Sequence, residues 1–274
     1  MEVCIINIKL RNAIKKNKAL YAFAQWLVVK KSESFYKKIN KTTSNLSKIL
    51  ALKDSAKGKK CYIVGNGPSL TMEDLELIKS EDCFASNLIF KIFDKTNWRP
   101  KYYFILDRYA DTKDVLNSID LDYLFVGDYF WKYRGMKNKN AICIHTERNR
   151  NKNDIGFSVD ATKVLYSHFT VTHAMIQMAV YMGYKKIYLI GMDHNYSLEY
   201  DSNGKIISNS DIKSHVFKDE KPADVVANIE GMNKAYIACR KYCDDNNVEI
   251  YNSTRGGKLE WFKRKNLLES LKNE

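Results

Sequence analysis

The sequence predicts an α/β protein with an open, largely parallel sheet and helices on both of its faces, preceded by a helical extension. Short apolar runs alternate with segments of helical periodicity, which is typical of a doubly wound, Rossmann-like fold. The chain has 274 residues, of which 45% are apolar and 12% aromatic, so it can bury a substantial core. The predicted strands are Cys61–Val64, Cys83–Ser86, Tyr102–Leu106, Tyr123–Val126, Ala141–His145, Lys186–Ile190 and Glu249–Tyr251.

Positive charge is concentrated at the start of the chain. The net charge is +13, and residues 1–60 hold 15 basic and 3 acidic side chains, which leaves the other 214 residues close to neutral. A nucleic-acid groove across the main domain is therefore not indicated. We divide the chain into a basic extension, residues 1–57, and a catalytic domain, residues 58–274.

The extension is predicted to be helical, with one apolar stripe flanked by lysines. Such a basic amphipathic stretch is typical of helices that lie on an anionic membrane surface. A helix that packs on the main domain, or that joins two copies of the chain in a homo-oligomer, has the same pattern, and both interpretations stay open. The stripe consists of Leu20, Phe23, Ala24, Leu27 and Val28.

The sequence favours a cytoplasmic location, either free or peripheral on the inner face of the plasma membrane. The six cysteines form no C-x-x-C pair and mostly lie in apolar runs, as expected of reduced thiols. No signal peptide with a small-residue cleavage site is found, and the apolar stretch of residues 19–29 is too short to span a bilayer.

The first predicted strand ends in the turn Gly65-Asn66-Gly67-Pro68-Ser69. Glycines permit close backbone approach, and Ser69 is placed to cap a helix that begins directly after it. A strand that leads through a glycine turn into a helix N-terminus presents free N–H groups to an anion, so we expect a phosphate here. A tight turn without a ligand also explains the glycines, but an amide side chain between them favours a ligand contact.

Polar side chains follow the other predicted strands as well. A single polar residue after a strand is most often a turn former. Because the carboxyl ends of parallel strands meet at one edge of the sheet, where α/β proteins bind ligands, several such residues together indicate a site. They are Asn87 after the second strand, Asp107 after the third, Asp193, His194 and Asn195 after Lys186–Ile190, and Asn252 and Thr254 after the last.

Two further segments are expected to border this edge. A helix beginning at Thr170 and ending at Gly183 would offer hydroxyls and free N–H groups in its first turn, which also holds Thr172 and His173, although plain capping explains these residues too. Residues 195–225 are polar and are predicted to form a long loop or lid, with Tyr196 and Tyr200 near its start and His215 further along. A helix over residues 224–245 follows.

Several common reaction types lack their motifs. The turn after the first strand has neither the third glycine of the dinucleotide fingerprint nor the Gly-Lys-Ser/Thr ending of a P-loop. The chain contains no H-E-x-x-H, no G-x-S-x-G and no D-x-D flanked by strands. Metal hydrolysis, triad chemistry and Mg²⁺-dependent sugar transfer of the D-x-D kind therefore gain no support, and no metal ligand is predicted.

Five segments together resemble a known family: YIVGNGPSL, FASN, ILD, TVTHAMIQMAVYMGYKKIYLIGMDHNY and YNSTRGGKL. They look like the MptE-like domain (domain of unknown function 115), which also forms the core of flagellin motility accessory factors. That core is similar to bacterial lipo-oligosaccharide sialyltransferases of glycosyltransferase family 42. The resemblance covers about residues 58–262 and implies a sialyltransferase-like variant of the predicted fold.

The resemblance implies where a donor nucleotide would bind. In the sialyltransferases the G-N-G-P-S turn and a following asparagine hold cytidine monophosphate, and a T-S-G segment touches its phosphate. The third strand ends there in an asparagine, where this chain has Asp107, and T-S-G corresponds here to Thr170-Val171-Thr172. The residues implied for the donor include Gly65, Asn66, Gly67, Ser69 and Asn87.

The resemblance also implies a catalytic histidine in the lid. The family segment reads S-H-Y-I-G-H, and its second histidine is catalytic, whereas His215 of this chain matches the first. We assign His215 as the general base, with His194 beside Asp193 as its competitor, because imidazole accepts a proton near neutral pH. The family's phosphate-assisting tyrosines have no counterpart at the same spacing, and Tyr196 and Tyr200 merely lie nearby.

The sequence therefore predicts a metal-independent glycosyltransferase that moves a sialic-acid-like sugar from a CMP-linked donor to a cell-surface glycan. One alternative is a diphosphokinase that transfers pyrophosphate from ATP to a hydroxymethylpterin and needs Mg²⁺, for which Asp107 and Asp193 are available. Another is a nucleotide-binding scaffold without turnover. The predicted catalytic residues are His215, His194 and Asp193; the predicted donor-binding residues are Gly65, Asn66, Gly67, Pro68, Ser69, Asn87, Asp107, Thr170, Thr172, His173, Tyr196, Tyr200, Asn252 and Thr254.

Overall fold

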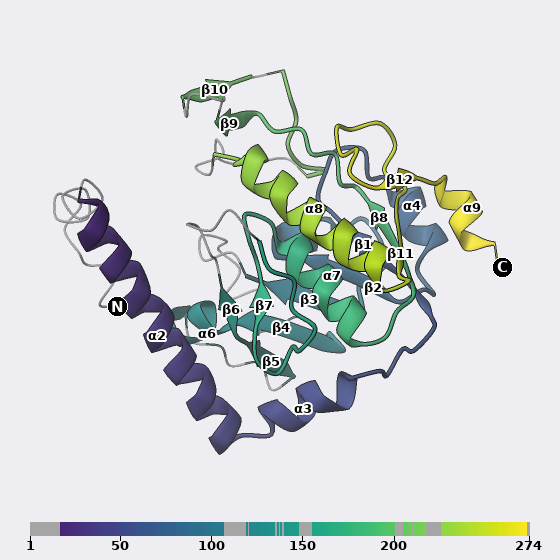
Figure 1. The fold of residues 1–274 in the computed structure, drawn as a ribbon. Coiled ribbons are helices and arrows are strands. Elements are labelled where there is room, and N and C mark those ends of the chain that lie inside the picture. Colours follow the sequence, from purple (N-terminus) through teal and green to yellow (C-terminus); the bar gives the residue numbers. More distant parts are fainter. Residues whose placement is uncertain are drawn as a thin grey trace.

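The computed structural model describes residues 17–106, 119, 121–134, 136, 138, 140–147, 155–200, 205–209, 211–217 and 226–272. Within these ranges one large parallel sheet carries helices on both faces, which confirms the predicted fold class (Figure 1). Every predicted strand is present, and a short last strand is added. The strands of the large sheet are β1 (Lys60–Val64), β2 (Cys83–Ser86), β3 (Tyr102–Ile105), β4 (Tyr123–Gly127), β5 (Ala141–Ile144), β8 (Lys186–Ile190), β11 (Glu249–Asn252) and β12 (Lys263–Arg264).

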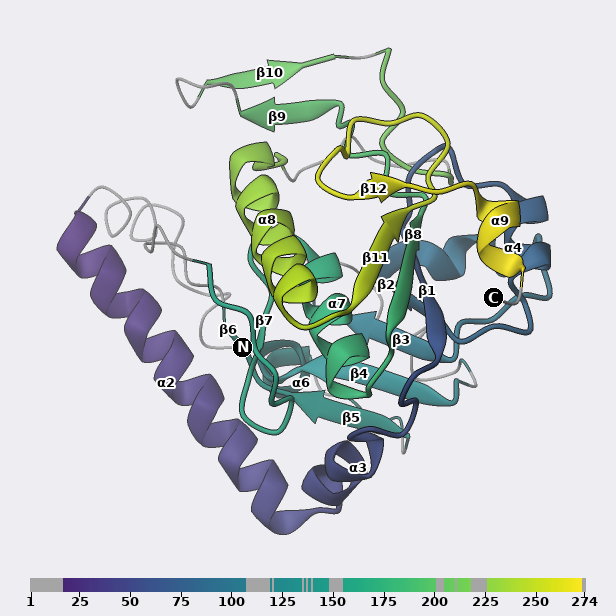
Figure 2. The ribbon, with the colours of Figure 1, turned by 45° about the vertical axis from the view of Figure 1, so that its right-hand side comes forward.

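The central strands are apolar and buried after their first residue because both faces of the sheet are covered, whereas the edge strand β12 is basic and exposed. In β1, Cys61 and Ile63 belong to one buried cluster and Tyr62 and Val64 to the other, as the alternation of side chains along a strand requires. Figure 2 shows α7 and α8 side by side over the face of the sheet to which Cys61 and Ile63 point. That face is covered by α3 (Asn45–Leu52), α7 (Val171–Tyr181) and α8 (Ile229–Asp245); the other by α4 (Met72–Leu77), the 3₁₀ helix Asn87–Ile92, α6 (Asp128–Arg134) and α9 (Leu267–Leu271).

The order of the strands fixes where a ligand would bind. It runs β12-β11-β8-β1-β2-β3-β4-β5, so the chain adds strands to one side of β1 and then returns to its other side with β8. β1 and β8 are paired over their whole length, from Lys60 opposite Lys186 to Val64 opposite Ile190. The topological switch point therefore lies between the C-terminal ends of these two strands.

The N-cap of helix α4 lies two residues later than the sequence predicts. Its N-cap is Thr71, whose hydroxyl accepts a hydrogen bond from the backbone N–H of Asp74, while the Asp74 carboxylate accepts one from the N–H of Thr71. This capping box satisfies two donors that a helix end leaves free. The prediction that Ser69 caps this helix is therefore wrong.

The N-terminal extension is helical over its described part, as predicted. Helix α2 (Lys18–Thr42) leads into α3, and Tyr36 of α2 is buried, with its hydroxyl donating to the carbonyl of Thr162. The side chain of Asn45 accepts a hydrogen bond from the N–H of Cys143 at 2.7 Å and donates to its carbonyl at 2.9 Å, so it completes the edge of β5. Residues 1–16 lie outside the described part. None of the described helices is both long and apolar enough to cross a membrane.

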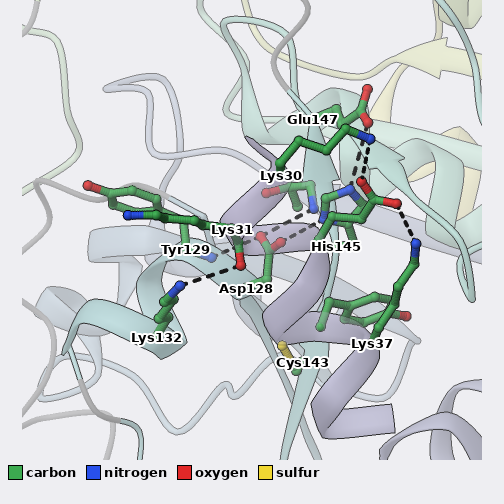
Figure 3. A network of polar contacts seen from close by, with 12 residues as sticks. Lys30, Lys31, Lys37, Asp128, Tyr129, Lys132, Cys143, His145 and Glu147 are labelled. Carbon is green, nitrogen blue, oxygen red and sulfur yellow. Dashed lines mark hydrogen bonds and ion pairs between the residues drawn. The ribbon is translucent and has the colours of Figure 1, made fainter. Parts of the chain in front are cut away.

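A buried ion pair lies between α2 and the ends of β4 and β5. The Nδ1 atom of His145 is 2.6 Å from Oδ2 of Asp128, and its Nε2 atom is 3.7 Å from Glu147 (Figure 3). The ring of Tyr36 stacks on that of His145 with 5.7 Å between their centroids. Burial by itself lowers the pKa of His145, but the hydrogen bonds and charges of Asp128 and Glu147 outweigh it and raise this pKa to about 9.

The predicted lid is not a plain loop. It contains an antiparallel hairpin of β9 (Leu198–Tyr200) and β10 (Ile206–Ser208), while residues 201–204, 210 and 218–225 lie outside the described part. The helix predicted over residues 224–245 begins at Ile229, because the side chain of Asn228 caps it by accepting from the N–H of Gly231. A second small pair, β6 (Thr146–Glu147) and β7 (Leu165–Tyr166), precedes α7.

Candidate functional site

A cavity of about 140 Å³ opens at the switch point. It is lined by the turns after β1, β2 and β8, by the first turn of α7, by one residue of α8 and by residues 214 and 215 of the predicted lid. Ten of the predicted site residues line it: Gly65, Asn66, Gly67, Asn87, Thr170, Thr172, Asp193, His194, Tyr196 and His215. Its other lining residues are Ser86, Val171, Met175, Gly191, Met192, Asn195, Ser214 and Tyr236.

The two glycines of the first turn are required by close packing against the turn after β8. A Cβ atom at Gly65 would lie 2.3 Å from the carbonyl oxygen of Gly191, and one at Gly67 would lie 1.9 Å from Oδ2 of Asp193. The backbone N–H groups of Gly65 and Gly67 donate to the carbonyls of Ile190 and Gly191. The glycines therefore join two strand ends from distant parts of the chain.

The N–H and hydroxyl groups of Ser69, which we expected to bind a phosphate, donate hydrogen bonds to Asp193 instead. Its carboxylate accepts a hydrogen bond of 2.7 Å from the hydroxyl of Ser69 and one of 3.2 Å from the backbone N–H of the same residue. Ser69 therefore fixes Asp193, and neither Ser69 nor the exposed Pro68 lines the cavity. The negative charge at this turn is supplied by the protein itself.

Four buried polar atoms at the cavity have no hydrogen-bond partner within the described part of the chain. They are the side-chain oxygens of Asn66, Asn87 and Asn195 and the Nδ1 atom of His194. A buried polar atom without a partner costs free energy, and most such atoms in folded proteins are paired. Their convergence on one cavity indicates a ligand that carries several hydrogen-bond donors.

The protonation of His194 is fixed by its neighbours. The Oδ1 atom of Asn233 accepts a hydrogen bond of 2.8 Å from the indole N–H of Trp261, a group that can only donate, and this sets the orientation of the amide. The same oxygen lies 2.9 Å from Nε2 of His194, so Nε2 must carry the proton. In the neutral ring, Nδ1 then keeps a lone pair that can accept a hydrogen bond, and it has no partner in the described part of the chain. Burial lowers the pKa of His194, which favours this neutral form.

The first turn of α7 forms another wall. Thr170 is its N-cap, and the Thr170 hydroxyl accepts a hydrogen bond from the N–H of Thr172, as predicted. Tyr236, from α8, reaches the same place, and burial raises the pKa of its phenol. The helix N-terminus adds a partial positive charge to a cavity whose described lining contains no lysine or arginine.

The lid reaches the first turn through its backbone. The N–H of Val216 donates to the carbonyl of Asn66 at 2.7 Å, and the hydroxyl of Ser214 accepts from the N–H of Ser197 at 3.0 Å. His215 lies between these two anchors, and its ring stacks on Phe217 with 4.9 Å between centroids. Residues 214–216 of the predicted lid therefore lie against the turn after β1, and His215 lines the cavity.

Several predicted site residues lie elsewhere. His173 is fully buried beneath the site, beside Phe157 and His168, and burial lowers its pKa to about 3. Tyr200 is exposed on β9. Asp107 lies outside the described residues.

Asn252 and Thr254 also lie away from the cavity. The side chain of Asn252 binds the carbonyl of Leu259 and the N–H of Thr254, and the Thr254 hydroxyl accepts from the N–H of Met192. They face a different cleft, of about 570 Å³, which also holds the Arg255–Asp74 ion pair. Both residues therefore stabilise the turn after β11.

Three residues that complete the site were not predicted. Asn195, in contrast, was expected at this edge of the sheet together with His194. Asn233 and Tyr236 are three residues apart on α8, and Trp261 comes from the loop after β11. Only the spacing on α8 was a usable signal, because polar side chains one turn apart on a helix face the same neighbour.

No group of three or more His, Cys, Asp or Glu residues able to hold a metal ion is found in the described part of the chain. Asp193 is the carboxylate among the described lining residues, and it is bound to Ser69. Independence of metal stays a prediction.

The fold and the position of the cavity define a Rossmann-like α/β protein whose candidate site lies at the topological switch point. The chain belongs to the MptE-like family: the family described as 6-hydroxymethylpterin diphosphokinase MptE-like matches residues 33–199. No curated protein matches the sequence.

Two solved structures are similar to this chain at low sequence identity. One is the sialyltransferase CstII from Campylobacter jejuni in complex with a substrate analogue, cytidine-5'-monophosphate, with a TM-score of 0.39 and 14% identity, covering 77% of this chain and 87% of the other. The second is a mammalian sialyltransferase in complex with Gal-beta-1-3GalNAc-ortho-nitrophenol, with a TM-score of 0.34 and 10% identity, covering 84% and 86%. Neither similarity identifies a substrate for this chain.

Proposed function

We propose that the protein is a glycosyltransferase that binds a nucleotide-linked sugar at the switch-point cavity and transfers the sugar to a glycan. The observation that carries the proposal is the set of four unpaired buried atoms on Asn66, Asn87, Asn195 and His194. Three amide oxygens and one imidazole lone pair are acceptors, and the hydroxyls of a ribose or a sugar and the amino group of a base are the matching donors.

A CMP-linked, sialic-acid-like donor fits this arrangement. Such a donor has one phosphate, and the N-terminus of α7 with Thr170 and Thr172 offers N–H groups and a hydroxyl to a single anion without any cationic side chain. Departure of a phosphate ester requires stabilisation of its developing charge, and the acceptor hydroxyl must lose a proton. Neither step requires a redox cofactor.

The geometry favours His194 as the general base. Its Nε2 proton is held by Asn233, so Nδ1 can accept a proton from an acceptor hydroxyl and the charge that develops is stabilised by that hydrogen bond. His215 is the alternative, because it lies on the lid at the same cavity. Asp193 is a positioning residue in this proposal, since its carboxylate binds Ser69.

Nucleotide binding is the first test. We expect CMP to raise the melting temperature of the protein more than CDP, UDP, GDP or ATP, with no further rise on adding Mg²⁺, and calorimetry to give one site per chain. Turnover is then measured by release of CMP from a CMP-linked nonulosonic acid in the presence of glycan acceptors. Absence of any nucleotide effect on melting would refute the proposal.

A second candidate function follows from the description of the family. A diphosphokinase would transfer pyrophosphate from ATP to a hydroxymethylpterin and would need carboxylates for Mg²⁺. Stabilisation by ATP with Mg²⁺, exceeding that by CMP, would favour this function. Saturable nucleotide binding without release of CMP or AMP under either set of conditions would favour a scaffold without turnover.

A further inference from the structure

One side of helix α2 packs on the rest of the protein. The opposite side is exposed to solvent and yet carries large apolar side chains. The buried side includes Ser32 and Tyr36, each 4% exposed. Phe23 and Leu27 each lie nine residues before one of these, which at about 3.6 residues per turn is about two and a half turns. Phe23 and Leu27 therefore face away from the core.

The outward face carries large apolar side chains in its first half. Leu20, Phe23, Trp26 and Leu27 recur at spacings of three and four and are 47%, 56%, 53% and 37% exposed. The rings of Phe23 and Trp26 stack with 5.9 Å between centroids. Figures 1 and 2 both show this end of α2 extending past the other labelled elements. We call these four residues the apolar half of the outward face.

The same face becomes basic in its second half. Lys30 and Lys37 follow Phe23 at intervals of seven residues, and Lys31 and Lys38 follow Leu27 at intervals of four and seven. All four lysines are exposed, as is Lys41. Helix α2 holds six lysines and a single acid, Glu33, so the helix has a net charge of +5.

We propose that this outward face binds an anionic phospholipid surface, with the apolar half in the interface and the lysines on the headgroups. Aromatic and leucine side chains beside lysines have the chemistry that a membrane interface requires. A protein partner would need a complementary acidic patch. A second copy packed in parallel would bring lysines against lysines, which is repulsive, and the antiparallel arrangement is left to the sedimentation test. The proposal does not depend on the proposed function.

The test measures binding of the full chain to vesicles of about two parts phosphatidylcholine to one part phosphatidylglycerol. We expect cosedimentation at low salt, loss of binding to phosphatidylcholine alone, and release at about 1 M salt, where charges are screened beyond about 3 Å. The triple variant F23S/W26S/L27S should bind more than about tenfold more weakly. Its control is Leu268→Ser, which removes a side chain that is 59% exposed on α9.

The charge contribution is tested separately. The variant K30Q/K37Q/K41Q should also bind more than about tenfold more weakly, because each lysine near an anionic surface contributes to binding. The matched control is K79Q/K234Q/K241Q, three exposed lysines that are paired with acids on other helices. Both triple variants should keep the melting temperature of the wild type within a few degrees, since Lys30 and Lys37, like the control lysines, form only exposed ion pairs, which contribute little to stability.

Other occupants of the face give different results. If the wild-type chain ignores anionic vesicles and sediments as a dimer that F23S/W26S/L27S converts to a monomer, the face joins two copies and the proposal is wrong. If the wild type ignores vesicles and the same variant unfolds at a much lower temperature, the face is covered by the chain itself, and the proposal is equally wrong.

Discussion

His145 and Asp128 form a buried ion pair just beyond the ends of β4 and β5, next to helix α2. The carboxylate of Asp128 is fully buried, and the distance between its Oδ2 atom and Nδ1 of His145 is 2.6 Å. The pair lies at the ends of adjacent strands, and Tyr36 of α2 stacks on the imidazole. The N-terminal extension therefore contacts the domain through His145, a side chain whose charge changes with pH.

Stability should fall as the pH rises from 6.5 to 9. The pKa of His145 is raised to about 9 in the folded protein, against a usual value of about 6.5. The stabilisation is complete below the unfolded pKa and is lost as the pH passes through the folded one. Urea unfolding at both pH values should show a decrease on the order of 1–3 kcal/mol in the free energy of unfolding.

His145→Gln provides the comparison for this prediction. It removes the titrating group while retaining a side chain that can hydrogen-bond to Asp128, so its stability should be lower at pH 6.5 and nearly independent of pH up to 9. His215→Gln, which changes a histidine outside this pair, should keep the pH dependence of the wild type. An equal pH dependence in His145→Gln and the wild type would show that the ion pair contributes nothing.

Trp261→Phe should impair turnover without removing any cavity residue. The substitution keeps an aromatic ring but deletes the indole N–H, so the amide of Asn233 is free to rotate and the tautomer of His194 is no longer fixed. We expect nucleotide affinity to change little, while kcat falls by about tenfold and His194→Gln lowers it by about 10²- to 10⁴-fold. The ¹⁵N shifts of the imidazole should show a single Nε2–H tautomer in the wild type and a mixture in Trp261→Phe.

The two candidate bases are separated by a direct comparison. If His215→Gln loses turnover to the extent expected of a removed base, while His194→Gln keeps near-normal turnover and both bind nucleotide, the base lies on the lid. A single tautomer in Trp261→Phe would show that the indole does not orient Asn233.

Asn66→Ala should weaken nucleotide binding without lowering the melting temperature appreciably. The side-chain oxygen has no partner in the described structure, and the amide nitrogen makes only a 3.4 Å hydrogen bond to the carbonyl of Ser86. Loss of one hydrogen bond to a ligand should cost about 1.5 to 3 kcal/mol if the ligand group is charged, and less if it is neutral. Calorimetry measures this, with the exposed Asn209→Ala as control. Unchanged affinity would leave Asn66 with a role in the turn alone.

Gly67→Ala should disrupt the site through sterics. The added methyl group would lie 1.9 Å from Oδ2 of Asp193, so either the turn or the Asp193 side chain must move. We expect a loss of about 1–3 kcal/mol in the free energy of unfolding together with weaker nucleotide binding. Gly127→Ala is the control, because the nearest atom to its Cβ would be 3.4 Å away, at ordinary contact distance. Equal stability of the two variants would contradict the packing described for Gly67.

The strands and the edge that carries the cavity could be predicted from local patterns. Runs such as Lys186–Ile190 are apolar because both faces of the sheet are covered, and the residues after them meet at one edge by topology. The start of α4 was mispredicted because Ser69 and Thr71 are both good caps and are only two residues apart. The contact between Ser69 and Asp193, which decides between them, spans 124 residues.

The arrangement of hydrogen bonds around His194 could not be predicted in the same way. It depends on Asn233 and Trp261, which lie 39 and 67 positions further along the chain and meet His194 only in the folded protein. Asn252 and Thr254 were predicted from position alone: Asn252 ends β11 and Thr254 lies just beyond it, but their side chains bind neighbouring turns. Position after a strand indicates proximity to a site and does not assign a role.

The pairing of β1 with β8 also has a kinetic consequence. More than a hundred residues separate the two strands, so during synthesis β1 and β2 are complete well before β8 leaves the ribosome, at about 5–20 residues per second. Until then, the side of β1 that will pair with β8 is an open apolar strand edge, able to add another strand. Contacts this distant in sequence also slow folding. The cavity therefore assembles late, and a nascent chain that stops before β8 exposes the strand on which its own binding site is built.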